Sequence, residues 1–186
     1  MLIILGSLDS EQSQIEKIAR EVGGFSVAYA AAPIPFGPKK GEMGRVGPGV
    51  AATGYLVGSE YFSGSPVDPY LAVEQMPGAA TLTGPIQGHF DHHAPQNPNT
   101  HRPPAEAWEA SSIGQFVRYL QTQQGMMYGE IPEEWLEIAA CDHCLGAACA
   151  GAVPGVDLSP GSPGYSRLLE RTHASYGAGV SIEKFT

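Results

Sequence analysis

The first 31 residues, MLIILGSLDSEQSQIEKIAREVGGFSVAYAA, decide the fold class. Residues 1–8 are largely apolar, as is typical of a strand buried on both faces. A capping-box pattern that starts at Asp9 predicts a helix over residues 10–22. A glycine pair ends this helix, and residues 25–31 form a second predicted strand. This β-α-β order predicts an α/β fold, with a mostly parallel sheet and flanking helices.

The rest of the chain alternates between periodic segments and loops rich in Pro and Gly. Residues 33–50 and 58–70 are predicted as loops, with a strand at 51–57 between them. We find no internal repeat and no linker, so we expect a single domain over residues 1–186. The other predicted elements are a short helix over 71–76, a strand over 85–90, and helices over 105–124, 132–150 and 165–171.

Composition excludes several classes of protein. The chain has 186 residues, 42% of them hydrophobic, which suits one ordinary soluble domain. No run of about 18 apolar residues occurs, so we expect no membrane-spanning helix. The net charge of −9 argues against affinity for duplex nucleic acid, because such affinity needs Lys and Arg to neutralise phosphates. A homo-oligomer is compatible with this sequence.

The cysteines indicate a reducing compartment. Cys141, Cys144 and Cys149 are odd in number and lie close together in the sequence, unlike a secreted disulfide framework. We therefore expect a cytoplasmic protein. We also expect no disulfide between Cys141 and Cys144, because an i, i+3 pair on a helix has its Cβ atoms too far apart.

The strongest chemical signal is GHFDHHAPQN, residues 88–97. Asp91, His92 and His93 are three ionisable residues in a row at the end of a predicted strand. Ligands of α/β sheets bind just beyond the carboxyl ends of strands. A carboxylate beside two imidazoles can orient one on a metal ion and leave the other for a phosphate. The structural alternative is an exposed polar loop.

A second signal is IAACDHCLGAAC, residues 138–149. Asp142 and His143 interrupt an otherwise apolar predicted helix, where a buried charge is costly unless it is paired or bound to metal. A hydrogen-bonded Asp–His pair in the core is the structural alternative. Cys141 and Cys144 form a C-x-x-C pattern, which leaves open a structural zinc site in an interaction module.

Charged residues elsewhere add two further candidates. Asp9 lies at the turn between the first predicted strand and its helix. It either caps the helix or faces the ligand crevice, and Glu11, two residues later, could point the same way. The positive cluster of this acidic chain lies in the first predicted loop. It is either simply exposed to solvent or a surface that contacts substrate phosphates. Its members are Lys39, Lys40 and Arg45.

Together these motifs resemble the DHH superfamily of metal-dependent phosphoesterases. Asp91-His92-His93 matches the D-H-H triplet of the third motif, and residues 110–115, ASSIGQ, look like the helix that follows it. Asp142 is similar to the fourth-motif Asp, and residues 8–11 look like a reduced first motif with Asp9 and Glu11. The resemblance covers residues 1–150 and implies the fold of the DHH catalytic domain.

The chain also departs from this pattern. No histidine precedes His89, so the first-motif His is missing. The second-motif acid is one of Glu60, Asp68 and Glu74. We expect no separate C-terminal substrate-binding domain in the remaining 35 or so residues, which are too few to form one.

The resemblance implies a metal-dependent hydrolase of a phosphoester or phosphoanhydride, acting on a small nucleotide-type substrate. Mn²⁺ or Mg²⁺ would be held by Asp9, His92 and Asp142, which are therefore expected to converge. Asp91 would orient His92, while His93 would contact or protonate the phosphoryl group. The catalytic set is Asp91, His93 and His143. The main alternative is a catalytically reduced protein that only binds a nucleotide or other small ligand.

Overall fold

The computed structural model contains two compact units, residues 1–95 and 96–186, and each is described by itself. The expectation of a single domain stays a prediction, because compactness does not show whether each unit folds alone. The structure describes residues 1–6, 9–35, 37–46, 51–74, 84–93, 97–126 and 128–176, with the backbone alone for 174–176.

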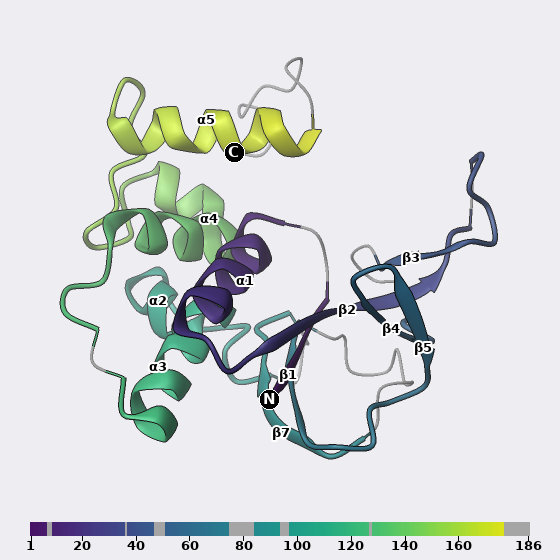
Figure 1. Cartoon of the computed structure of the whole chain (residues 1–186). Helices are drawn as coiled ribbons and strands as arrows, with labels where there is room; N and C mark the ends of the chain where they lie inside the picture. The colour runs from purple at the N-terminus through teal and green to yellow at the C-terminus, as the bar shows by residue number, and fades with distance from the viewer. Residues whose placement is uncertain are drawn as a thin grey trace. The chain divides into compact units, whose positions relative to one another are not determined.

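The first unit is an α/β unit with a seven-stranded mixed sheet among its described residues. The strand order is β5-β4-β2-β1-β6-β7, and β3 pairs with β2. Four neighbouring strands run parallel to one another: β2, β1, β6 and β7. Each of the other strands pairs antiparallel with its neighbour: β3 and β4 with β2, and β5 with β4. The α/β fold predicted from the sequence is confirmed (Figure 1). The strands are β1 Leu2–Leu5, β2 Ser26–Pro33, β3 Met43–Arg45, β4 Gly54–Val57, β5 Glu60–Ser63, β6 Tyr70–Val73 and β7 Ile86–Phe90.

The centre of the sheet is buried because its strands are continuous apolar runs. Ile4 of β1 lies opposite Ala28 of β2 and Ala72 of β6. These three residues are fully buried, and with Tyr70 they form a hydrophobic cluster on one face. Side chains alternate between faces along a strand, so a buried run of this kind requires cover on both faces.

The helix α1, Ser10–Val22, connects β1 to β2 and contacts β2. Its predicted bounds are confirmed. The Asp9 carboxylate accepts a hydrogen bond from the Gln12 backbone N–H at 2.8 Å, which caps the first turn. Gly23, at φ 75°, ends the helix in a conformation that favours glycine.

Three predictions for the first unit were wrong. Residues 71–76 were expected to be helical, but Tyr70–Val73 form strand β6 between β1 and β7. A four-residue apolar run does not by itself distinguish a strand from a helix, and here the two parallel neighbours decide. The predicted loops at 33–50 and 58–70 contain the short strands β3 and β5.

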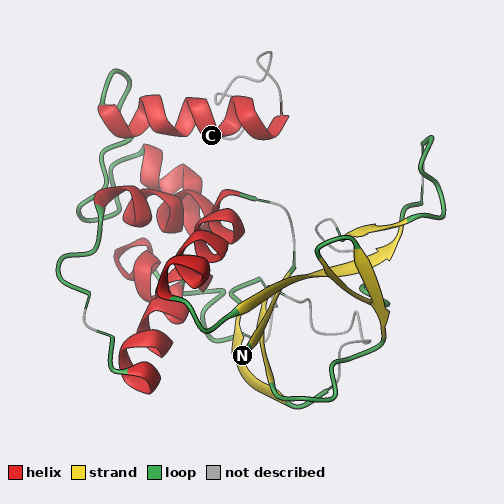
Figure 2. Cartoon of the chain, viewed as in Figure 1, coloured by secondary structure: helices red, strands yellow, loops and turns green. Residues whose placement is uncertain are grey.

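The second unit is helical in its described part (Figure 2). The helix predicted over 105–124 is broken at Ser111, which has an extended backbone and caps the following helix through Gly114 N–H. The final helix is longer than the predicted 165–171. None of the described helices is long and apolar enough to cross a membrane. The elements are the 3₁₀ helix η1 Pro104–Glu106 and the helices α2 Ala107–Ala110, α3 Ser112–Gln124, α4 Glu133–Cys149 and α5 Pro163–Tyr176.

A buried carboxylate joins α4 to α5. Glu137 is 0% exposed and accepts two hydrogen bonds from the Arg167 guanidinium, one of them 2.9 Å long. Arg171 Nη2 lies 3.6 Å from Glu137 Oε2. Gly164 makes room for this group, because a Cβ at that position would stand 2.6 Å from Glu137 Oε1. The second unit therefore combines its apolar core with an internal ion pair.

Candidate metal centre

The candidate site lies at the carboxyl ends of three adjacent parallel strands. Leu5, Val73 and Phe90 are the last residues of β1, β6 and β7, and they are neighbours across the sheet. The residues that follow them are Gly6, Glu74 and Asp91. The predicted placement of the D-H-H triplet just beyond a strand end is confirmed, at the sheet edge where α/β proteins bind ligands.

Two glutamates and two histidines gather at this edge. Glu11, Glu74 and His92 each offer a ligand atom, and these atoms lie within 4.8 Å of one another. The same holds for Glu74, His92 and His93. Ligand atoms about 2.1 Å from one ion are at most about 4.2 Å apart, so small side-chain movements would close either set on a metal.

Three of the four residues in the cluster are buried. Glu11 is 0%, Glu74 7% and His92 4% exposed, whereas His93 is exposed. Two ionised carboxylates at this separation repel each other by roughly 3–4 kcal/mol at an effective dielectric constant of 20. A divalent cation between them would replace this repulsion with attraction. The donor set and its burial therefore fit a bound cation.

Glu74 has an unusual backbone conformation. Its φ of 48° makes it the one non-glycine residue with positive φ in the described part of the chain. Such a conformation costs of order 1–3 kcal/mol and persists where the surroundings hold it. Here the Glu74 N–H donates to the Phe90 carbonyl at 2.8 Å, and Gly6 allows β1 to approach the Glu74 carbonyl closely. Strain of this kind is concentrated at functional sites.

Asp91 is buried between two histidines. Its Oδ1 accepts a hydrogen bond from the His93 backbone N–H at 2.9 Å and lies 3.4 Å from His93 Nδ1, while His89 Nε2 lies 4.0 Å from Oδ2. Burial raises the pKa of the Asp91 carboxyl, but the hydrogen bonds from His93 and the charges of His89 and His93 outweigh it, so the pKa is lowered. The orientation of His92 by Asp91 stays a prediction.

The two adjacent histidines lie side by side. Their ring centroids are 4.0 Å apart, and both rings take part in ligand groups with Glu74. Adjacent residues within a strand project to opposite faces, but these two imidazoles do not. The strand β7 ends at Phe90, so strand alternation no longer applies to these residues.

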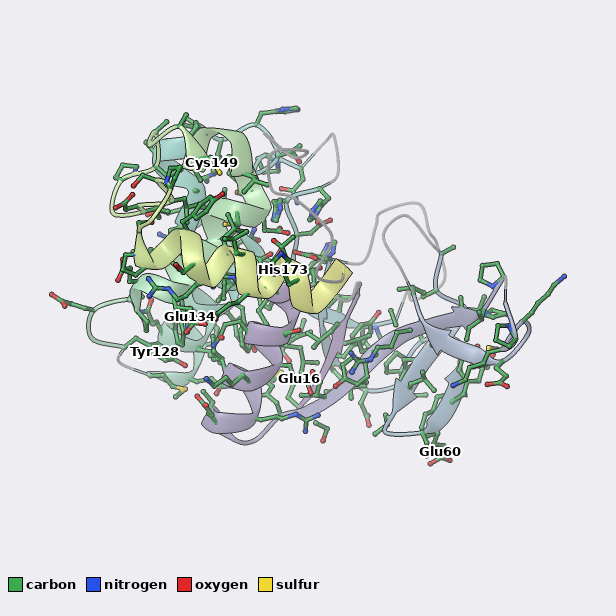
Figure 3. The ribbon with its side chains drawn as sticks, turned by 90° about the horizontal axis from the view of Figure 1, so that it is seen from above. Glu16, Glu60, Tyr128, Glu134, Cys149 and His173 are labelled. Atoms are coloured by element: carbon green, nitrogen blue, oxygen red, sulfur yellow. The ribbon has the colours of Figure 1, made fainter. Side chains whose placement is uncertain are left out.

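The structure distinguishes among the acidic candidates. Of the three possible second-motif acids, Glu74 belongs to the cluster, whereas Asp68 is exposed in a loop and Glu60 lies on β5, away from α1 (Figure 3). Asp9 caps α1, and one of the two ligand groups among the described residues contains Glu11, whereas neither contains Asp9. Metal binding by Asp9 stays a prediction. A carboxylate directly after a buried apolar run was the signal that could have identified Glu74.

The positive cluster extends from the same edge of the sheet. Lys39 and Lys40 are exposed in the turn that joins the carboxyl end of β2 to β3. The Arg45 guanidinium lies over the ring of Tyr29, whose hydroxyl donates to Glu16 at 2.6 Å. Arg45 thus has a structural role, and contact of these three basic residues with a substrate stays a prediction.

Asp142 and His143 belong to the second unit. Both are half-buried on α4, and His143 Nε2 is 3.1 Å from the Arg102 carbonyl oxygen. The helix is interrupted next to them, because Cys144 has φ −156° and ψ 55°. The convergence of Asp142 with His92 and a catalytic role for His143 stay predictions.

The cysteines are free thiols. The prediction that Cys141 and Cys144 form no disulfide is confirmed. Burial, the largest influence, raises the pKa of Cys141 to about 12. Among the residues that the structure describes, no group of three potential metal ligands includes a cysteine, so the structural-zinc alternative gains no support.

Comparison of the chain with protein-family models, with curated proteins and with solved structures finds no match. The function must therefore be argued from the site itself. What the residues establish is a buried cluster of glutamate and histidine side chains, at the ligand-binding edge of an α/β sheet, that could hold a metal ion.

Proposed function

We propose that Glu11, Glu74 and His92 bind a divalent metal ion and that the protein hydrolyses a phosphoester or phosphoanhydride with it. The observation that carries this proposal is the convergence of their ligand atoms within 4.8 Å. Carboxylate oxygens suit both Mg²⁺ and Mn²⁺, but imidazole favours transition metals. We therefore favour Mn²⁺ over Mg²⁺.

The chain's own residues would position the reaction and move a proton. A bound ion would supply an activated water and neutralise charge on the phosphoryl group. His93 is exposed, and its Nδ1 faces the buried Asp91 carboxylate, so its Nε2 is the nitrogen suited to protonate a leaving oxygen. Asp91 stays ionised at neutral pH and holds the imidazole in that orientation, as its lowered pKa implies.

The resemblance to DHH phosphoesterases supports a small nucleotide-type substrate, although no family match tests it. Lys39 and Lys40 in the β2–β3 turn, and Arg45 at the end of β3, would contact its phosphates. Asp142 and His143, the candidates from the second unit, would add a ligand and a catalytic group. The free thiols suit a cytoplasmic location.

The test combines metal analysis with a substrate screen. Protein purified without chelator should bind Mn²⁺ and, with Mn²⁺, should hydrolyse a nucleotide, a cyclic dinucleotide, pyrophosphate or a short oligonucleotide. Glu74→Gln should lose the metal and the activity, while His93→Ala should keep the metal and lose a factor of ~10²–10⁴ in rate. Glu60→Gln, a change at an exposed carboxylate on the same sheet, is the matched control.

Two results would overturn the proposal. Absence of metal binding by the wild-type protein removes its basis. Metal binding with tight nucleotide binding and no hydrolysis in the screen would instead support the alternative of a catalytically reduced binding protein.

A further inference from the structure

A glutamine next to the cluster forms hydrogen bonds through both the oxygen and the nitrogen of its side-chain amide. Gln12 Oε1 accepts a hydrogen bond from the Gly6 backbone N–H at 3.1 Å, and Gln12 Nε2 donates to Glu74 Oε2 at 2.7 Å. Both bonds are buried, and Gln12 is 2% exposed. The amide has one possible orientation, because a backbone N–H can only donate and so requires the amide oxygen opposite it.

We propose that Gln12 is a positioning residue, which holds Glu74 so that this carboxylate binds the metal ion through Oε1 alone. This inference rests on the proposed metal binding. Gln12 donates a hydrogen bond to Glu74 Oε2, so it acts through this carboxylate. Since Oε2 already accepts the amide proton, the geometry favours monodentate coordination through the other oxygen.

The same glutamine also connects the Glu74 side chain to the end of the neighbouring strand. Glu74 directly follows β6 with φ 48°, and Gly6 directly follows the neighbouring strand β1. Gln12 connects the Gly6 N–H to the Glu74 side chain, so it links the ends of both strands to the first turn of α1. A strained residue needs such external support to keep its conformation.

The role of the Gln12 side chain can be separated from that of the helix. The Asp9 cap uses the Gln12 backbone N–H, which any substitution except proline retains. Gln12→Leu keeps about the same volume and removes both side-chain hydrogen bonds. Gln12→Asn keeps the amide and shortens its reach by one methylene. Gln14→Leu is the control, because Gln14 lies on the same helix and is also buried, at 8% exposed.

The experiment measures Mn²⁺ affinity by titration calorimetry and the visible absorption spectrum after Co²⁺ substitution. Gln12→Leu and Gln12→Asn should weaken Mn²⁺ binding by about 10–100-fold, as loss of a residue that orients a ligand does. They should also change the Co²⁺ spectrum, because Glu74 can then bind through a different set of oxygens. Gln14→Leu should keep the wild-type affinity and spectrum. Thermal unfolding of the metal-free proteins identifies any variant that fails to fold, and Gln12→Asn is the milder of the two changes.

The outcomes separate this inference from the proposed function. If the wild type binds Mn²⁺ and folded Gln12 variants bind it equally well with an unchanged Co²⁺ spectrum, Gln12 is no positioning residue and the metal site stands. If the wild type binds no metal, both fail. If Gln14→Leu weakens binding as much as Gln12→Leu, the effect belongs to the helix as a whole and the inference is overturned.

Discussion

Replacement of Gly6 by alanine should disturb both the stability of the first unit and the proposed metal site. A Cβ at position 6 would collide with the Glu74 carbonyl oxygen and stand 3.0 Å from the Glu74 carbonyl carbon and the Val73 carbonyl oxygen. All three are backbone atoms, so no side chain can rotate away. Ordinary contact needs about 3.5–4.0 Å, so the ends of β1 and β6 must separate by roughly 1 Å.

The cost of this overpacking is about 1–3 kcal/mol. For a protein of this size that corresponds to a Tm lower by roughly 2–12 °C, measured by calorimetry on the metal-free protein. Mn²⁺ affinity should fall as well, because the shift displaces the Gly6 N–H from Gln12 and moves Glu74. Gly129→Ala is the control, since a Cβ there meets nothing within 4 Å. Wild-type stability and affinity in Gly6→Ala would refute the close approach of β1 to Glu74.

Three further predictions concern the second unit. Glu137→Ala removes the fully buried carboxylate that pairs with Arg167. In urea unfolding it should lower the free energy of unfolding more than Glu133→Ala does, because the Glu133 carboxylate is 62% exposed. Equal losses for the two variants would contradict the buried pair. Asp142→Asn should weaken Mn²⁺ binding in calorimetry if Asp142 is a metal ligand, and an unchanged affinity would exclude it. With a pKa of about 12, the Cys141 thiol is ionised in only about one molecule in 10⁴ at pH 8. It should therefore react with a thiol reagent much more slowly in the native protein than in urea. Fast labelling of the native protein that maps to Cys141 would disprove its burial.

The elements that the sequence predicted well are those with strong local signals. The bounds of α1 follow from Asp9, which caps the first turn, and from Gly23, which ends the last. The D-H-H triplet was placed correctly beyond β7, because an apolar run followed by polar residues marks a strand end. The break at Ser111 was missed, since the helices on either side of it share one apolar periodicity.

The sequence by itself determined the α/β class, the first helix and the position of His92 and His93 at a strand end, since each depends on neighbours within a few residues. Only the tertiary structure decided which carboxylates join them. Glu74 is 18 residues before His92 and Glu11 is 63 before Glu74, so their meeting depends on the placement of β6 between β1 and β7. That strand order is a set of long-range pairings that no local periodicity encodes, and it assembles the candidate metal centre from three separate segments of the chain.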